Sequence, residues 1–377
     1  MEFDFSWLLL GLPLAFALGW IASRLDLRQL RIEDRQAPRA YFRGLKFLLN
    51  EQQDQAIDAF IEAVRNDPDT SELHFALGNL FRRRGEYERA VRIHEHLLSR
   101  ADLDKADRHR AQHALSLDYL KAGLLDRAED ALHRLVGTDY EAQALLALLS
   151  IYERTRDWQA ASETARKITT HGIGDFTNRL AHYMCEQASE RDPPEATKLL
   201  RDAQALSPSS ARPGLELANL QQRSGHPDLA FETLCELARN IPMAIGLIAR
   251  PLAETASTPD RQNNARALLI AFQASTPSLD VMDALAYLEG SAEGKQRHYL
   301  RHLEREPSLV AASRLVANNS MEDMQARPLI QRALDKAAQP LARYRCAACG
   351  FESARHFWQC PGCQGWDSFP ARRIEEL

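Results

Sequence analysis

The pattern of apolar and polar positions changes character along the chain. After one long uncharged run near the start, residues 38–338 carry apolar side chains at helical spacing, and the remaining residues lose that spacing. In this middle part, small residues recur 34 positions apart, as Gly44 and Gly78 do, and as Ala196 and Ala230 do. A fixed period of this length predicts an array of helix pairs.

A 34-residue period built from two helices is typical of the tetratricopeptide repeat. Its small residues let the two helices of a pair approach closely, and its large apolar residues fill the groove made by the next pair. A proline after the second helix ends it, because proline lacks the N–H that a helix needs. No single pair can bury its apolar face, so the pairs must stack. The predicted fold is therefore all-α: a superhelix, or α-solenoid, of about seven to nine helical hairpins over residues 38–338, degenerate after residue 245.

For nearly every Leu, Ala, Phe and Tyr at the repeat positions we expect packing in the core of the array. The residues at the repeat positions, including the prolines that end the second helices, are Gly44, Phe47, Ala56, Phe60, Ala63 and Pro68, then Leu77, Gly78, Phe81, Ala90 and Leu97, then Leu115, Tyr119, Ala128, Leu132 and Leu135, then Leu148, Tyr152, Trp158, Ala161 and Ile168, then Tyr183, Ala196, Leu200, Ala203 and Pro208, then Leu217, Ala218, Ala230, Leu234 and Pro242, and more loosely Leu252, Ala265, Leu269, Phe272 and Pro277. The concave surface of such an array binds peptides or other proteins.

The uncharged run near the start reads FSWLLLGLPLAFALGWIAS, nineteen residues from 5 to 23. At 1.5 Å of rise per residue, such a helix comes close to the ~30 Å thickness of a bilayer's hydrocarbon core. We therefore expect residues 1–23 to form a transmembrane anchor and residues 24–37 to form a juxtamembrane linker.

Two alternatives to an anchor are a cleaved signal peptide and a buried core helix. The sequence AFA at 15–17 offers a cleavage site, but Glu2 and Asp4 stand where a signal peptide carries positive charge. A charge-free run of this length is uncommon in soluble cores. The anchor remains the preferred interpretation.

The charges around the run predict its orientation. The short preceding side carries only acidic residues and the α-amine, whereas basic residues follow closely, and the positive-inside rule then places the bulk of the protein in the cytoplasm. These residues are Arg24, Arg28, Arg31, Arg35, Arg39, Arg43 and Lys46.

Composition adds little beyond an ordinary globular body. With 26% charged residues and a formal net charge of −5, nothing in the balance indicates a nucleic-acid partner. No phosphate-binding loop or nucleophile elbow occurs, so we expect no catalytic residues and no enzyme. Five histidines fall on different repeats or faces, without catalytic spacing. They are His74, His94, His96, His109 and His113.

Four of the six cysteines crowd into residues 343–377, with the spacing C-x₂-C, ten residues, then C-x₂-C. Two such knuckles predict a tetrahedral thiolate site formed by Cys346, Cys349, Cys360 and Cys363, a small rubredoxin-like or zinc-ribbon domain. Geometry alone does not choose between one zinc and one iron ion. We expect Gly350 to adopt a positive φ in the first turn, and Pro361 and Gly362 to shape the second.

Aromatic residues surround the predicted site and need a place in the fold. We expect most of them to form a small core beside the metal, while some pack the knuckle against the last helices or present it to a partner. They are Tyr344, Phe351, Phe357, Trp358, Trp366 and Phe369. Cys185 and Cys235, at apolar helical positions, are expected to be buried inert thiols.

The whole chain resembles the lipopolysaccharide assembly protein B (LapB) family of Gram-negative bacteria. The resemblance rests on the anchor, on ALGNLFRRRGEYERAVRIHEHLL at 76–98, on DYLKAGLLDRAEDAL at 118–132 and on YRCAACGF…FWQCPGC at 344–363. It implies a single-pass inner-membrane protein, largely cytoplasmic, whose four cysteines hold the metal, iron if the domain is rubredoxin-like and zinc as the other possibility.

The resemblance also implies an adaptor that regulates lipopolysaccharide biosynthesis. In that family the protein presents the deacetylase LpxC to the membrane protease FtsH for degradation, and other lipopolysaccharide assembly or transport proteins of the inner membrane are expected partners. Two other functions remain open: a general scaffold for envelope assembly, and a rubredoxin-like electron carrier.

Overall fold

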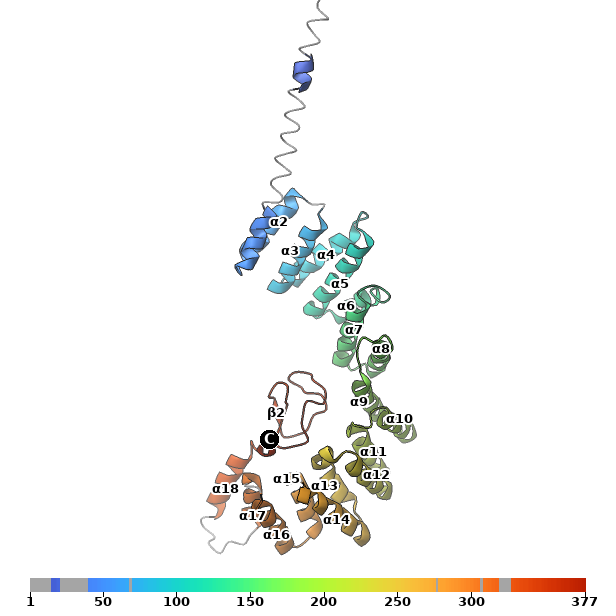
Figure 1. The fold of residues 1–377 in the computed structure, drawn as a ribbon, viewed down its shortest axis with the longest axis vertical. Helices are drawn as coiled ribbons and strands as arrows, with labels where there is room; N and C mark the ends of the chain where they lie inside the picture. The colour runs from blue at the N-terminus through green and yellow to red at the C-terminus, as the bar shows by residue number, and fades with distance from the viewer. Residues whose placement is uncertain (1–14, 21–39, 68–69, 276, 306–307, 319–326) are drawn as a thin grey trace, which may run out of the picture. The chain divides into compact units, whose positions relative to one another are not determined.

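The computed structural model of the chain describes residues 15–20, 40–67, 70–275, 277–305, 308–318 and 327–377. It forms two compact units, one up to Thr155 and one from Arg156 onward. Figure 1 labels the helices and strands of both units. The division falls inside the fourth predicted repeat. Most of the predicted anchor and the whole linker lie outside the described residues, and so does Pro68. No helix among the described residues is both long and apolar enough to cross a bilayer.

Every described element of the first unit is helical. Residues 15–20 and 40–49 are helical, and six further helices follow. They are α2 (Gln53–Asn66), α3 (Ser71–Arg84), α4 (Tyr87–Ser99), α5 (Lys105–Ala122), α6 (Leu125–His133) and α7 (Glu141–Thr155). Consecutive helices from α2 to α7 pack on each other, as stacked hairpins require.

Glycine sets both the turns and the spacing of the α3–α4 hairpin. Gly85 ends α3 with a φ of 84°, in the left-handed region that glycine adopts without steric cost. A Cβ at Gly78 would lie only 2.6 Å from the ring of His94 on α4, so a larger residue would force the two helices apart. The small position predicted at Gly78 is therefore explained by helix contact.

A buried polar network joins the α3–α4 hairpin to α5. Asp118 and His94 have no exposed surface, and the His94 Nδ1 lies 2.5 Å from a carboxylate oxygen of Asp118. Arg82 donates to the other oxygen at 2.9 Å. Sequence patterns did not indicate this network. The expectation that the histidines lie on different repeats or faces is wrong for His74 and His96, whose rings lie 5.6 Å apart within one hairpin.

The second unit consists of further helical pairs and ends in a small four-cysteine domain, residues 344–370, which is called the metal domain below. Its helices are α8 (Trp158–Thr170), α9 (Thr177–Ser189), α10 (Pro193–Leu206), α11 (Arg212–Arg223), α12 (Pro227–Asn240), the 3₁₀ helix η1 (Pro242–Ala244), α13 (Ile245–Thr255), α14 (Pro259–Ser275), α15 (Leu279–Glu289), α16 (Ala292–Leu303), α17 (Leu309–Asn318) and α18 (Arg327–Ala338). Two short antiparallel strands, β1 (Tyr344–Arg345) and β2 (Glu352–Ser353), and a 3₁₀ turn η2 (Ile374–Glu376) follow.

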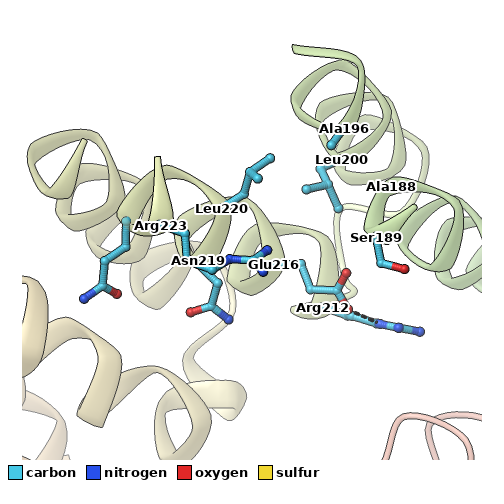
Figure 2. A pocket seen from close by; sticks show the side chains of 10 residues that line it. Ala188, Ser189, Ala196, Leu200, Arg212, Glu216, Asn219, Leu220 and Arg223 are labelled. Carbon is cyan, nitrogen blue, oxygen red and sulfur yellow. Dashed lines mark hydrogen bonds and ion pairs between the residues drawn. The ribbon is translucent and has the colours of Figure 1, made fainter. Parts of the chain in front are cut away.

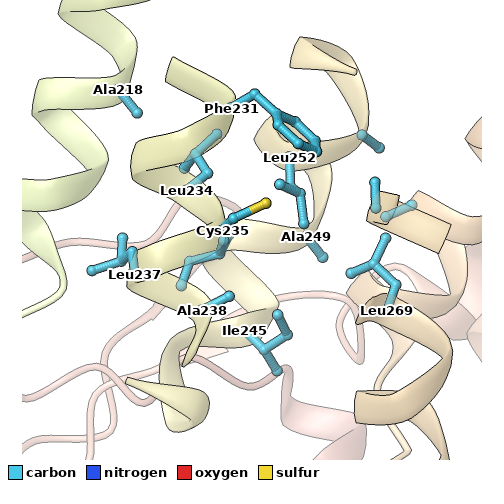
Figure 3. Packing of buried hydrophobic residues seen from close by; sticks show 14 of the residues in the cluster. Ala218, Phe231, Leu234, Cys235, Leu237, Ala238, Ile245, Ala249, Leu252 and Leu269 are labelled. Atoms are coloured by element: carbon cyan, nitrogen blue, oxygen red, sulfur yellow. The ribbon is translucent and has the colours of Figure 1, made fainter. Parts of the chain in front are cut away.

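Most of the predicted core positions are buried in both units, whereas Phe47 and Phe272 are only half-buried. In the first unit Ala90 and Leu132 have no exposed surface, and in the second Ala230 and Leu252 have none. Figure 3 shows how small and large side chains of α11 to α14 pack together around Cys235. The prediction of tetratricopeptide-type packing is confirmed at these positions.

The two isolated cysteines belong to this packing. Cys185 is fully buried and Cys235 is almost fully buried. Burial raises the pKa of both thiols, so each stays protonated and unreactive near neutral pH. The prediction of buried inert thiols is consistent with these surroundings.

Candidate metal centre

Two similar knuckles form the cysteine site. In the first, the N–H of Gly350 donates to the carbonyl of Cys346 at 2.9 Å, and the N–H of Cys346 donates to Phe351. In the second, the N–H of Gln364 donates to the carbonyl of Cys360 at 2.8 Å. The N–H of Cys360 donates to the carbonyl of Gly365, also at 2.8 Å. The two cysteine pairs are thus held by two tight turns with the same hydrogen-bond pattern.

The two turns use different residues to achieve one backbone shape. Gly350 has a φ of 76°, as predicted. In the second knuckle the equivalent position is Gln364, with a φ of 59°. We expected Pro361 and Gly362 to shape this turn and did not predict the left-handed conformation of Gln364, because a glutamine gives no sequence signal for it.

The four sulfurs lie together in a geometry that fits a metal. All four cysteine Sγ atoms lie within 4.8 Å of one another, with Cys346 3.8 Å from Cys363 and Cys349 3.7 Å from Cys360. A tetrahedral ion bonded to sulfur at ~2.3 Å places its ligands ~3.8 Å apart, so the residues fit such an ion. Zinc and iron both suit four thiolates, and the distances do not separate them.

The site has one buried side and one exposed side. Cys346 and Cys360 are 1% exposed, whereas Cys349 and Cys363 face solvent. A hydrogen bond from Ser368 lowers the pKa of Cys346 to about 6, which favours the thiolate that binds a metal. For Cys349 the N–H of Phe351 acts to lower the pKa, but desolvation and the neighbouring cysteines raise it overall, to about 12.

A tryptophan and an aspartate just after the second knuckle fix the domain to α8 and α9. The ring of Trp366 stacks on His182 at 4.9 Å and meets Tyr183 and Trp158 edge-on. His182 is completely buried, and its Nε2 donates to both oxygens of Asp367 at 2.9 Å. The four-cysteine domain therefore packs against helices near the start of this unit, and Trp358 also packs against the core of the later helices α11 to α15, as expected for some of its aromatic residues.

The residues after the knuckle fix its other side to the later helices. Arg373 pairs with Asp280 of α15 at 2.9 Å, while its guanidinium lies 4.1 Å over the ring of Tyr344. Glu376 accepts from the N–H of Leu279 at 2.7 Å, where α15 begins. An acidic side chain at a helix N-terminus satisfies a free N–H and faces the positive end of the helix dipole.

The first turn of α17 is held in the same way. The carboxylate of Glu375 accepts from the hydroxyl of Ser308 at 2.9 Å and from the N–H groups of Leu309 and Val310. The backbone also comes very close to α13: a Cβ at Gly246 would lie 2.5 Å from the carbonyl oxygen of Ala371. The metal domain and the residues after it thus contact α8, α9, α13, α15 and α17.

The aromatic residues of the knuckle divide between two roles. Tyr344 and Phe369 are buried in a small cluster with Cys346 and Cys360, which is the core that was predicted beside the metal. Burial raises the pKa of Tyr344 to about 12 and lowers the pKa of His356. Trp366 instead contacts the helices, and Phe351 is 40% exposed.

The fold and site together define a tetratricopeptide-repeat protein that carries a four-cysteine, rubredoxin-type domain. Residues 344–370 match the rubredoxin metal binding domain, and residues 73–108 and 113–172 match tetratricopeptide repeats. The chain belongs to the lipopolysaccharide assembly protein B family, since it is 32% identical to that protein from Escherichia coli K12, over 98% of this chain and 99% of the relative.

A second relative gives the same result. The lipopolysaccharide assembly protein B of Haemophilus influenzae Rd is 29% identical, over 96% of each chain. Among solved structures, Naa15/Naa10 bound to HypK-THB matches with a TM-score of 0.44 at 16% identity, over 83% of this chain and 55% of that one. A likeness this loose decides nothing about function.

Proposed function

We propose that this protein is a membrane-anchored adaptor of lipopolysaccharide biosynthesis that presents the deacetylase LpxC to the protease FtsH. The observation that carries the proposal is the nearly full-length relationship to lipopolysaccharide assembly protein B, covering repeats and metal domain together. Helical repeats supply binding surface, and the four-cysteine domain, fixed to those repeats through His182 and Arg373, stabilises that surface.

A non-enzymatic role agrees with where the polar groups are used. The His94–Asp118 pair resembles a catalytic dyad in composition, but both side chains are completely buried in helix packing. His182 and Asp367 hold the metal domain in place. The metal then has a structural part, because a domain this small has little other core.

Tethering explains how such a protein would act. An anchor over residues 5–23 in the inner membrane, with the bulk of the chain on the cytoplasmic side, would keep the repeats beside a membrane protease. A soluble substrate held there meets the protease at an effective concentration that reaches roughly millimolar values. Degradation would then be limited by capture of the substrate.

The half-life of LpxC in cells with and without this protein is the decisive measurement. Loss of the protein is expected to stabilise LpxC and to cause excess lipopolysaccharide. Deletion of residues 1–24 is expected to weaken the regulation while leaving the repeats folded. An unchanged half-life would reject the adaptor and favour a general scaffold for envelope assembly.

One observation favours a second candidate, an electron carrier. Cys349 and Cys363 are exposed, so an iron ion in the site would have a path for electron exchange with a partner. A reversible titration of the purified protein near the potential of an iron–thiolate centre would support this candidate. Copurification with a protease and its substrate would support the adaptor.

A further inference from the structure

Inside the helical array, each helical pair covers apolar side chains of its neighbours. Figure 2 shows one such junction, where Leu200 of α10 and Leu220 of α11 line a cavity of about 490 Å³ between two neighbouring pairs. Leu200 is buried there and Leu220 is half-buried. The helix at residues 40–49, named the first repeat helix below, is the first described helix that packs into the array, so no preceding described pair covers it.

The first repeat helix has one packed face and one exposed face. On its exposed face, Phe42 is 66% exposed and Leu49 is 83% exposed. At the described residues from α2 to α7, no large apolar side chain is more than 44% exposed. The packed face lies on a cluster formed with α2, α3 and α4, to which it contributes Ala40, Tyr41, Leu45, Phe47 and Leu48.

Phe42 and Leu49 belong to one small surface with Lys46. They are seven residues apart, which is two helical turns, so they lie on the same side of the helix roughly 10 Å apart. Lys46 is exposed and lies one turn from each of them. The end repeat of a helical array needs a polar outer face to stay soluble, and this surface departs from that rule. Exposed apolar surface of this kind marks contact with a partner or with a membrane.

The charges of the first repeat helix indicate what covers this surface. The helix carries Arg43 and Lys46 and no acidic residue. Arg43 pairs with Glu62 of α2, at the side of the surface. A lysine can lay its aliphatic stem along apolar material while its ammonium group reaches anionic groups above. Aromatic, leucine and lysine side chains on one face therefore fit the boundary between acyl chains and headgroups of a membrane that contains anionic lipids.

The position of the helix in the chain favours a membrane over a second copy of this protein. Sixteen residues, 24–39, separate it from the predicted anchor, and such a length spans at most about 55 Å. The surface can thus reach the bilayer that holds the anchor. A two-fold contact between copies would instead bring the same surface of both together, with two like charges from Lys46 in one apolar contact.

We propose that the exposed face of the first repeat helix lies on the surface of a membrane that contains anionic phospholipids. Phe42 and Leu49 insert at the boundary between headgroups and acyl chains, and Lys46 pairs with a lipid phosphate. The first helical pair is then held against the bilayer and does not hang freely from the linker. This inference rests on the proposed function, in which an anchor places the chain in the inner membrane.

The test uses the full-length chain in nanodiscs made of phosphatidylglycerol and phosphatidylcholine in equal parts. The photo-crosslinking residue p-benzoylphenylalanine replaces Phe42 or Leu49, one position at a time. The matched controls carry it in place of Leu124, an exposed leucine of the same unit, or of Gln55, an exposed residue of α2. Mass spectrometry after irradiation identifies lipid adducts, and circular dichroism checks that each variant melts like the wild type.

The expected result is about tenfold more lipid adduct at positions 42 and 49 than at the two controls, because only the exposed face of the first repeat helix enters the lipid. The adducts are expected to fall several-fold with the additional substitution Lys46→Glu, and also in nanodiscs of phosphatidylcholine alone, because both changes remove attraction to anionic lipid.

Several results would overturn the proposal. They are equal adduct yields at all four positions, equal yields in the two kinds of nanodisc, crosslinks between two copies of the chain, and crosslinks from position 42 to a preceding segment of the same chain. The last two would assign the surface to self-association or to the chain's own residues.

Co-elution of the chain with the nanodiscs separates this inference from the proposed function. A chain that co-elutes but forms no lipid adduct at positions 42 and 49 would reject the surface contact and leave the anchored adaptor intact. A chain that elutes apart from the nanodiscs would reject the anchor and the surface contact together.

Discussion

Each unit contains a completely buried histidine bonded to an aspartate, but the two aspartates come from very different parts of the chain. His94 in the first unit meets Asp118, 24 residues further on, in the next helical pair. His182 in the second unit meets Asp367, 185 residues further on, in the metal domain. The first unit is therefore held by contacts between neighbouring repeats, as in other repeat proteins, whereas the second also depends on a remote domain.

Removing the metal is the strongest way to test this contrast. The variant Cys349→Ser is expected to lose the bound ion and the order of the knuckle, because metal binding in small thiolate domains contributes about 10–16 kcal/mol of folding free energy. Amide hydrogen exchange should then rise in α9 and at the starts of α15 and α17, while α3 to α5 keep their protection. Metal analysis measures the loss of the ion.

The control for this variant is Cys235→Ala, which removes a buried cysteine outside the metal site. It should retain one ion per chain and normal exchange in α9. Unchanged exchange in α9 and α15 after loss of the ion would show that the repeats do not depend on the metal domain.

The first unit should respond to loss of its own aspartate. In Asp118→Ala, His94 and Arg82 lose their buried partner, and breaking a buried charged network costs about 3–5 kcal/mol. Hydrogen exchange is expected to increase in α3, α4 and α5 and to stay the same in α9. Asp139→Ala, at an exposed loop position, is the matched control. Equal increases of hydrogen exchange in both units would contradict the conclusion that the Asp118 network stabilises the first unit alone.

A third variant separates folding of the knuckle from its docking. Trp366→Ala removes the ring that contacts Trp158, His182 and Tyr183, and for a partly exposed tryptophan we expect a loss of about 2–3 kcal/mol. The metal content should stay at one ion per chain while exchange in α9 rises. Phe351→Ala, which removes the exposed aromatic ring of the knuckle, should leave α9 unchanged. Loss of the metal in Trp366→Ala would mean that the ring folds the knuckle and does not merely dock it.

The smallest expected effect concerns the two turns of the metal site. Gln364→Gly places the residue that tolerates positive φ where glutamine now stands, so it should stabilise the knuckle by about 1 kcal/mol. Gly350→Ala, at the equivalent position of the other turn, should destabilise it by a similar amount. The rate of metal loss to a chelator measures both. Slower loss from Gly350→Ala than from wild type would contradict the shared turn geometry.

The sequence predicted those features that have a local or periodic signal. The 34-residue period identified the buried positions, such as Ala90 and Leu132, because each repeat must present the same small and large residues to its neighbours. The spacing of Cys346, Cys349, Cys360 and Cys363 indicated the metal site because both knuckles are short.

The contacts that fix the metal domain had no comparable signal. His182 lies in an ordinary amphipathic helix, and nothing in its neighbourhood distinguishes it from a surface residue. Asp367 and Arg373 follow the knuckle in a segment without periodicity. Their partners are roughly 90 to 185 residues away, and only the folded chain brings them together.

The distance along the chain between His182 and Asp367 has a consequence for biosynthesis. Chains grow at about 5–20 residues per second, so roughly 10–40 s separate the two residues during translation. Through that interval the aromatic surface formed by Trp158, His182 and Tyr183 has no Trp366 to cover it. Nascent chains of the second unit would thus expose an apolar patch that chaperones bind, and metal supply would set how quickly the patch is covered.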